Sequence, residues 1–278
     1  MGAGSKGSHR RQRDAFLMAH IAESLHWYDR TGGPAYTVKA KDGTERPTTL
    51  RDARKLDLVP SVTTIIRCAA APGLENWKAQ QVLLAALTTT RREDEQEAAY
   101  LQRIMDDSRE QAKKAAERGT AIHAAIQGYF EGNPAPAEFW PHVEATDKAV
   151  TGWGAKVNNM GWTPEASFSH PLGFGGKVDI SHLTGLFIAD FKTKEFAEDN
   201  RLKTWDEHAM QLAAYREGLG LPAARCAIVY VSVSNPGLAK LIEIPEQDLV
   251  RGWDCFKSLL QFWQAKNRYW PNREAIAA

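Results

Sequence analysis

The spacing of apolar residues changes from a helical to a strand period between residues 158 and 166, and this change constrains the fold more than any other feature. Before it, apolar residues recur every three or four positions, as Ile122, Ile126, Tyr129 and Phe130 do. After it, short segments rich in β-branched residues follow one another between turn signals. The sequence therefore predicts a helical N-terminal half followed by a half that carries a β-sheet.

The order of the expected elements defines a fold class. Helices are expected within 74–130, with a long one over 96–130, and over 142–158. The second half is expected to contain strands at 166–170, 176–182, 186–193, 225–233 and 238–244, and helices at 205–219 and 246–268. This order predicts an α/β (α+β) protein, in which a mixed sheet flanked by helices carries a helical N-terminal cap.

The chain is expected to divide into three parts. Residues 1–13 are basic and resemble either a disordered tail or a DNA-contacting arm, residues 14–95 form a hairpin and helical cap, and residues 96–278 form the core. In the cap, two turn signals within 26–49 predict a β-hairpin. Ser61 is a candidate N-cap, either of an ordinary helix or of one whose free N–H groups bind an anion.

Composition excludes several classes of protein. The 278 residues are 43% hydrophobic and 25% charged, values that rule out a fibrous or fully disordered chain. A net charge of +1 excludes a bulk polyelectrolyte binder, so any nucleic-acid contact must come from local basic residues. No apolar run approaches the ~18 residues of a membrane helix. We therefore expect a cytoplasmic protein and no membrane partner.

Two acidic residues and a lysine in neighbouring strands form the strongest chemical motif. Asp190 and Lys192 are two apart, so their side chains leave the same face of a strand. A two-residue turn at Thr184-Gly185 would place Asp179 directly opposite Asp190. Two carboxylates so close repel unless a cation lies between them, and their hard oxygens favour Mg²⁺ or Mn²⁺. The alternative is a purely structural salt bridge from Lys192 to one of the acids.

Two helical motifs extend this constellation. His123 follows Gly119 by one turn, and imidazole is a common ligand of divalent cations. The alternative for His123 is an ordinary core or surface histidine. Gln211 and Tyr215 lie on one face of the expected helix 205–219. They could hydrogen-bond a phosphate or nucleobase, or form a buried polar pair that packs on the sheet.

In chain order, Arg118-Gly119-Thr120-Ala121-Ile122-His123, Gly176-Lys177-Val178-Asp179, Asp190-Phe191-Lys192 and Gln211 to Tyr215 resemble the motifs of the PD-(D/E)XK nuclease superfamily. The most similar branch is the RecB-type one, which includes phage exonucleases and the mitochondrial genome maintenance exonuclease. The resemblance implies a restriction-endonuclease-like core. It also implies that His123, Asp179, Asp190 and the Phe191 carbonyl bind the metal.

The same resemblance assigns the remaining roles. Asp179, Asp190 and Lys192 would be catalytic, and Ser61, Arg118, Gln211 and Tyr215 would contact DNA. The implied protein is a Mg²⁺- or Mn²⁺-dependent deoxyribonuclease, an exonuclease of phage recombination or replication. It would act on linear DNA, at an end or a single-stranded region. The resemblance also allows for a recombination protein as a partner. The alternatives are a non-catalytic DNA-binding or assembly module on the same fold, and a hydrolase of small phosphoesters. The oligomeric state does not follow from the sequence.

Overall fold

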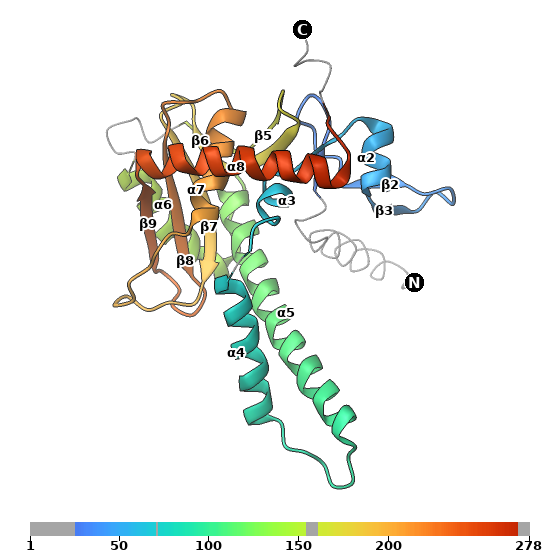
Figure 1. Ribbon diagram of the computed structural model, residues 1–278. Coiled ribbons are helices and arrows are strands. Elements are labelled where there is room, and N and C mark those ends of the chain that lie inside the picture. Colours follow the sequence, from blue (N-terminus) through green and yellow to red (C-terminus); the bar gives the residue numbers. More distant parts are fainter. Residues whose placement is uncertain (1–25, 71, 154–160, 272–278) are drawn as a thin grey trace, which may run out of the picture.

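A mixed five-stranded sheet forms the centre of the protein, as a computed structural model that describes residues 26–70, 72–153 and 161–271 shows (Figure 1). The strands follow the order β5-β6-β7-β8-β9. They are β5 (Trp162–His170), β6 (Phe174–His182), β7 (Phe187–Lys194), β8 (Arg225–Ser232) and β9 (Ala239–Ile244). Only β7 and β8 run parallel, and α7 (Asp206–Gly218) connects them. The predicted fold class is confirmed, although β5 begins four residues before the expected strand 166–170.

Helices cover both faces of the sheet because side chains alternate along its central strands. On β7, Ile188 packs in the cluster that contains α7 and α8 (Glu246–Asn267), whereas Ala189 packs in the cluster that contains α5 (Glu97–Phe130) and α6 (Trp140–Trp153). The apolar stripe of the closing helix is core, since Phe256, Leu260 and Trp263 are buried. The expected helix 142–158 begins at Trp140 and is described through Trp153, and its remainder lies outside the described residues.

The β5–β6 hairpin changes faces at one position. Val178 packs in the α7/α8 cluster and Ile180 in the α5/α6 cluster, although residues two apart on a regular strand share a face. On β5, Glu165 has a φ of 57°, in the left-handed region. The rungs Pro164↔Ile180 and Ala166↔Val178 flank this position on both sides. The kink therefore places Asp179 where the strand passes from one helical layer toward the other.

A helical arm projects away from the sheet. It consists of α4 (Pro72–Thr88) and the first part of α5, joined by a loop that contains the charged residues 91–95 (Figure 1). Within the arm, Ala85 and Ile104 are buried between the helices, and Arg103 binds Glu95 at 2.7 Å. Several large apolar side chains of the arm are exposed: Leu74, Trp77, Leu83, Leu84, Leu87, Leu101 and Met105.

Small elements of the N-terminal part pack beside α8. They are β1 (Trp27–Tyr28), β2 (Thr37–Lys39), β3 (Glu45–Pro47), α2 (Leu50–Leu56), β4 (Val59–Pro60) and α3 (Val62–Ile66), and the one-turn helix η2 (Ala137–Phe139) precedes α6. The predicted hairpin is β2–β3.

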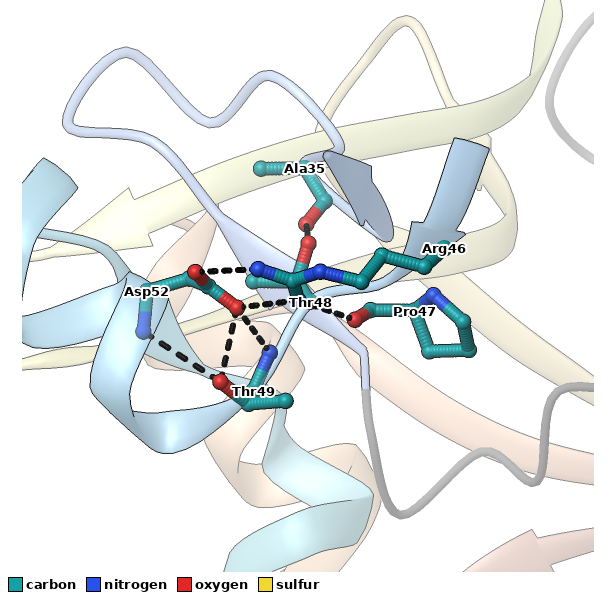
Figure 2. A network of polar contacts seen from close by, with 6 residues as sticks. All are labelled: Ala35, Arg46, Pro47, Thr48, Thr49 and Asp52. Carbon is teal, nitrogen blue, oxygen red and sulfur yellow. Dashed lines mark hydrogen bonds and ion pairs between the residues drawn. The ribbon is translucent and has the colours of Figure 1, made fainter. Parts of the chain in front are cut away.

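A polar network ties this hairpin to α2. Figure 2 shows Arg46 donating to both carboxylate oxygens of Asp52, at 2.6 and 2.8 Å, while Thr49 caps the helix. The Arg46 guanidinium holds the pKa of Asp52 well below its ordinary value.

The predicted division of the chain at residues 13 and 95 stays a prediction. The basic tail 1–13 lies outside the described residues. Among the helices of the described segments, none has the length and apolar character needed to cross a membrane.

Candidate active site

The candidate site lies where β6 separates from β7. The two strands pair at Ile180↔Ala189 and Ser181↔Ile188, which is the register predicted from a turn at Thr184-Gly185. The ladder stops there, so Asp179 and Asp190 occupy the next position without forming a regular rung. Instead, the Phe191 N–H donates to Asp179 Oδ2 at 2.6 Å. The end of the ladder frees two acidic side chains beside each other at the edge of the strand pair.

Helix α5 brings His123 to the first of these acids. His123 Nε2 lies 3.2 Å from Asp179 Oδ2, and the imidazole packs edge-on against Phe191. The helix approaches β7 closely one turn earlier, at Gly119. A Cβ atom there would lie only 2.6 Å from Thr193 Oγ1. Glycine at this position thus permits the approach of α5 that carries His123 to the strands.

Asp190 is the most enclosed charged group of the site, with 2% of its surface exposed. Gln211 Nε2 donates to Asp190 Oδ1 at 2.8 Å and to the Tyr215 hydroxyl at 2.8 Å, so both of its amide hydrogens are engaged. Lys192 Nζ lies 2.7 Å from Asp190 Oδ2 as an ion pair. That oxygen is fully buried and accepts no hydrogen bond of good geometry from the described residues.

The local electrostatics separate the two acids. Burial, and after it the charge of Asp179, raise the pKa of Asp190, and Lys192 opposes them, so that the pKa is about 6. Burial also acts to raise the pKa of Asp179, but His123 and Lys192 outweigh it, so this pKa lies below its ordinary value. Burial acts to lower the pKa of His123, and the charges of Asp179 and Asp190 raise it overall. One strongly ionised carboxylate and one that is costly to ionise therefore lie together.

The donor set of this cluster fits a hard divalent cation. Asp179 and Asp190 supply carboxylate oxygens, His123 supplies an imidazole nitrogen, and Asp190 Oδ2 is a buried oxygen whose neighbour is the Lys192 ammonium. Within the described segments, no three His, Cys, Asp or Glu side chains already converge in a metal-binding arrangement. In their place, His123 lies against Asp179 and Lys192 against Asp190. Each carboxylate is thus held by a cationic group that a metal could replace.

Three of the four predicted DNA-binding residues are buried, and the fourth is exposed. Ser61 is buried, and its hydroxyl accepts from the Thr64 N–H as the cap of α3. The predicted N-cap is thus present, and the contact of Ser61 with DNA stays a prediction. Arg118 lies exposed on α5. Gln211 and Tyr215 are only 7% and 5% exposed, and Gln211 donates to Asp190 and to Tyr215, as in the buried polar pair that was the alternative. Their contact with DNA stays a prediction.

Two residues of the site were missed by the sequence analysis. Lys177 and Glu165 form an ion pair beside Asp179, and Glu165 carries the left-handed backbone of β5. Burial lowers the pKa of Lys177, while the charges of Asp179 and Glu131 raise it in part. The position of Lys177, two residues before Asp179, was an available signal. Glu165 gave none, because its role depends on the kink.

Comparisons with known proteins add little to this description. No protein-family model and no curated protein matches the chain. Among solved structures, a candidate exonuclease from Eubacterium rectale is similar at 15% identity and a TM-score of 0.40, covering 54% of this chain and 68% of its own. The protein SSO0001 is similar at 14% identity and a TM-score of 0.30, covering 67% of this chain and 86% of its own.

Proposed function

We propose that this protein is a divalent-metal-dependent nuclease that hydrolyses phosphodiester bonds of DNA. The observation that carries the proposal is the buried carboxylate of Asp190, placed between Lys192 and Gln211 and next to the Asp179–His123 pair. A buried acid whose pKa is raised to about 6 is costly to keep ionised, and such groups are concentrated at functional sites. The resemblance of the four sequence motifs to RecB-type nucleases supports the same assignment.

Asp179, Asp190, His123 and the Phe191 carbonyl would hold Mg²⁺ or Mn²⁺ at this site. A divalent cation supplies positive charge that offsets the charge developing on phosphorus and its oxygens during hydrolysis. Gln211 fixes one oxygen of Asp190, so the carboxylate keeps a single orientation as it binds. Phe191 does the same for Asp179 through its N–H.

Lys192 provides the cationic group of the reaction. Its Nζ lies 2.7 Å from Asp190 Oδ2, and about a third of its side chain is exposed. Its ammonium can stabilise a non-bridging phosphate oxygen and orient the attacking water by hydrogen bonding. The water would attack phosphorus in line with the leaving oxygen. Because contacts to the phosphate backbone would dominate affinity, DNA binding should weaken steeply as the salt concentration rises.

We further propose the kind of nuclease, its partner and its compartment. The protein would be an exonuclease of phage recombination or replication type that acts on linear DNA from an end or a single-stranded region. A recombination protein is the expected partner, and the cytoplasm is the expected compartment.

The test is cleavage of end-labelled linear DNA and closed circular DNA, with Mg²⁺, Mn²⁺ or EDTA. We expect wild-type protein to degrade the linear substrate only with metal, and Asp190→Asn and Lys192→Met to lose at least a hundredfold in rate. Lys148→Met removes an exposed lysine of α6 that pairs with Glu144, and serves as the matched control. Undiminished cleavage by Asp190→Asn would refute the mechanism. Tight DNA binding without cleavage under any metal would instead identify a non-catalytic module.

A further inference from the structure

The tryptophans of this chain fall into three groups: those that are buried, those that pack against other rings, and those that are exposed. The spacing of apolar residues in the sequence does not distinguish these groups. Trp27 and Trp263 are buried, while Trp153 and Trp162 pack against Phe187. Trp205 is 53% exposed, the largest exposed fraction among the nine. Its indole forms no ring stacking, cation–π contact or hydrogen bond with the residues that the structure describes. Trp205 is therefore not part of the core.

The backbone that carries this exposed ring is fixed. Trp205 is the N-cap of α7, and its N–H donates to Nδ1 of the buried His208 at 3.1 Å. Two residues earlier, the Lys203 carbonyl accepts from the Tyr230 hydroxyl at 2.9 Å. A tryptophan with an anchored main chain and a free ring loses little conformational freedom when a flat ligand packs against it.

The same contacts place Trp205 near the candidate active site. Tyr230, which anchors the segment before Trp205, pairs with Lys192 across β7 and β8. Along α7, Gln211 contacts Asp190 and follows Trp205 by six residues. A rise of 1.5 Å per residue puts the start of the helix about 9 Å from Gln211 along its axis. In stacked DNA this distance corresponds to about two or three nucleotides.

Basic and acidic groups both lie near Trp205, since Asp206 and Glu207 follow it in the first turn of α7. Lys194 and Lys203 are exposed. Burial lowers the pKa of His208, the residue that holds the Trp205 N–H, and the charges of Lys192 and Lys194 add to this effect, bringing the pKa to about 4. Both ammonium groups therefore act on the start of α7. Asp206, the acid next to Trp205, is held by Arg251 at 3.0 Å, which offsets its repulsion of phosphate.

We propose that Trp205 is a stacking platform for an unpaired nucleobase of the substrate strand, a few nucleotides from the bond to be cleaved. The inference rests on the proposed nuclease function and deepens it, because a platform of this kind selects single-stranded DNA. Stacking on an aromatic side chain tolerates every base, since all bases have a π face. Loss of one stacked base corresponds to about 5- to 150-fold weaker binding.

The experiment measures binding of fluorescein-labelled oligothymidine to the full chain in EDTA, so that no cleavage intervenes. We expect Trp205→Ala to weaken binding about 5- to 150-fold and Trp205→Phe to restore most of it, since phenylalanine also stacks. Trp140→Ala is the matched control: Trp140 is 45% exposed, contacts Tyr129 on the α5/α6 side of the sheet, and is expected to leave binding unchanged. Trp205→Leu retains apolar bulk without a π face and should resemble the alanine variant.

A second substrate isolates the base from the backbone. An oligonucleotide of abasic residues keeps its phosphates, so wild type and Trp205→Ala should bind it equally. The inference is overturned if Trp205→Ala binds oligothymidine within twofold of wild type, if the loss persists on the abasic strand, or if Trp140→Ala loses as much.

These outcomes are distinguishable from failure of the proposed function. A base-dependent loss in Trp205→Ala, with no cleavage by wild type in Mg²⁺ or Mn²⁺, would retain the platform and reject hydrolysis. Cleavage by wild type with unchanged binding by Trp205→Ala would do the reverse. Absence of any binding to single-stranded DNA would reject the platform.

Discussion

Replacing Asp190 by asparagine should stabilise the metal-free protein at alkaline pH. Folding buries this carboxylate almost completely and raises its pKa to about 6 from an ordinary 3.8. One pKa unit is worth about 1.4 kcal/mol, so the folded state loses about 3 kcal/mol when Asp190 ionises in it. The asparagine side chain would keep an oxygen that accepts from Gln211 and would carry no charge. Lys192 is a third exposed and can turn its ammonium to water.

The pH dependence of this effect follows from the direction of the shift. Between about pH 4 and pH 6 the folded protein holds a proton on Asp190 that the unfolded chain has released. The free energy of unfolding of wild type therefore falls as pH rises through this window. At pH 8 the full difference of about 3 kcal/mol between variant and wild type applies, and at pH 5 about half of it remains.

Urea denaturation in EDTA at pH 5 and pH 8, followed by tryptophan fluorescence, measures both values. Addition of Mg²⁺ should then stabilise wild type at pH 8 and leave Asp190→Asn unchanged, because a ligand that binds only the folded state stabilises it. A variant less stable than wild type at pH 8, or a difference equal at the two pH values, would refute the assignment of a costly buried charge to Asp190.

Two further substitutions test the packing and hydrogen bonding of the site. Gly119→Ala should destabilise the protein, because its Cβ would lie 2.6 Å from Thr193 Oγ1, and adding Thr193→Ala should relieve the clash. The double variant should be about 0.5–1 kcal/mol more stable than Thr193→Ala alone, owing to the helix propensity of alanine, and thermal melts that find it less stable would contradict the close approach. Gln211→Met removes the donor to Asp190 and should cost about 1–3 kcal/mol of stability at pH 8. A denaturation midpoint that does not move would exclude that hydrogen bond.

The position of the two acids illustrates how far sequence reasoning extends into the site. The turn at Thr184-Gly185 set the register of β6 and β7 because a two-residue hairpin fixes which residues face each other. It did not reveal that the ladder ends at Ile180↔Ala189, or that Phe191 would donate to Asp179 in place of a regular rung. Those features depend on how the two strands separate beyond the last rung, which the turn residues do not determine.

The sequence by itself determined the order and type of the sheet strands and of the long helices, because apolar periodicity, turn residues and caps act over a few neighbouring positions. It also identified Asp190 and Lys192 as partners, since strand geometry places residues two apart on one face. Only the tertiary structure decided which groups surround them. His123, Gln211 and Tyr230 reach the site from segments separated by many residues, and their burial arises when α5 and α7 close on the two faces of the sheet. Burial and partner distance set the pKa of Asp190 and leave Trp205 exposed, and neither quantity is encoded locally.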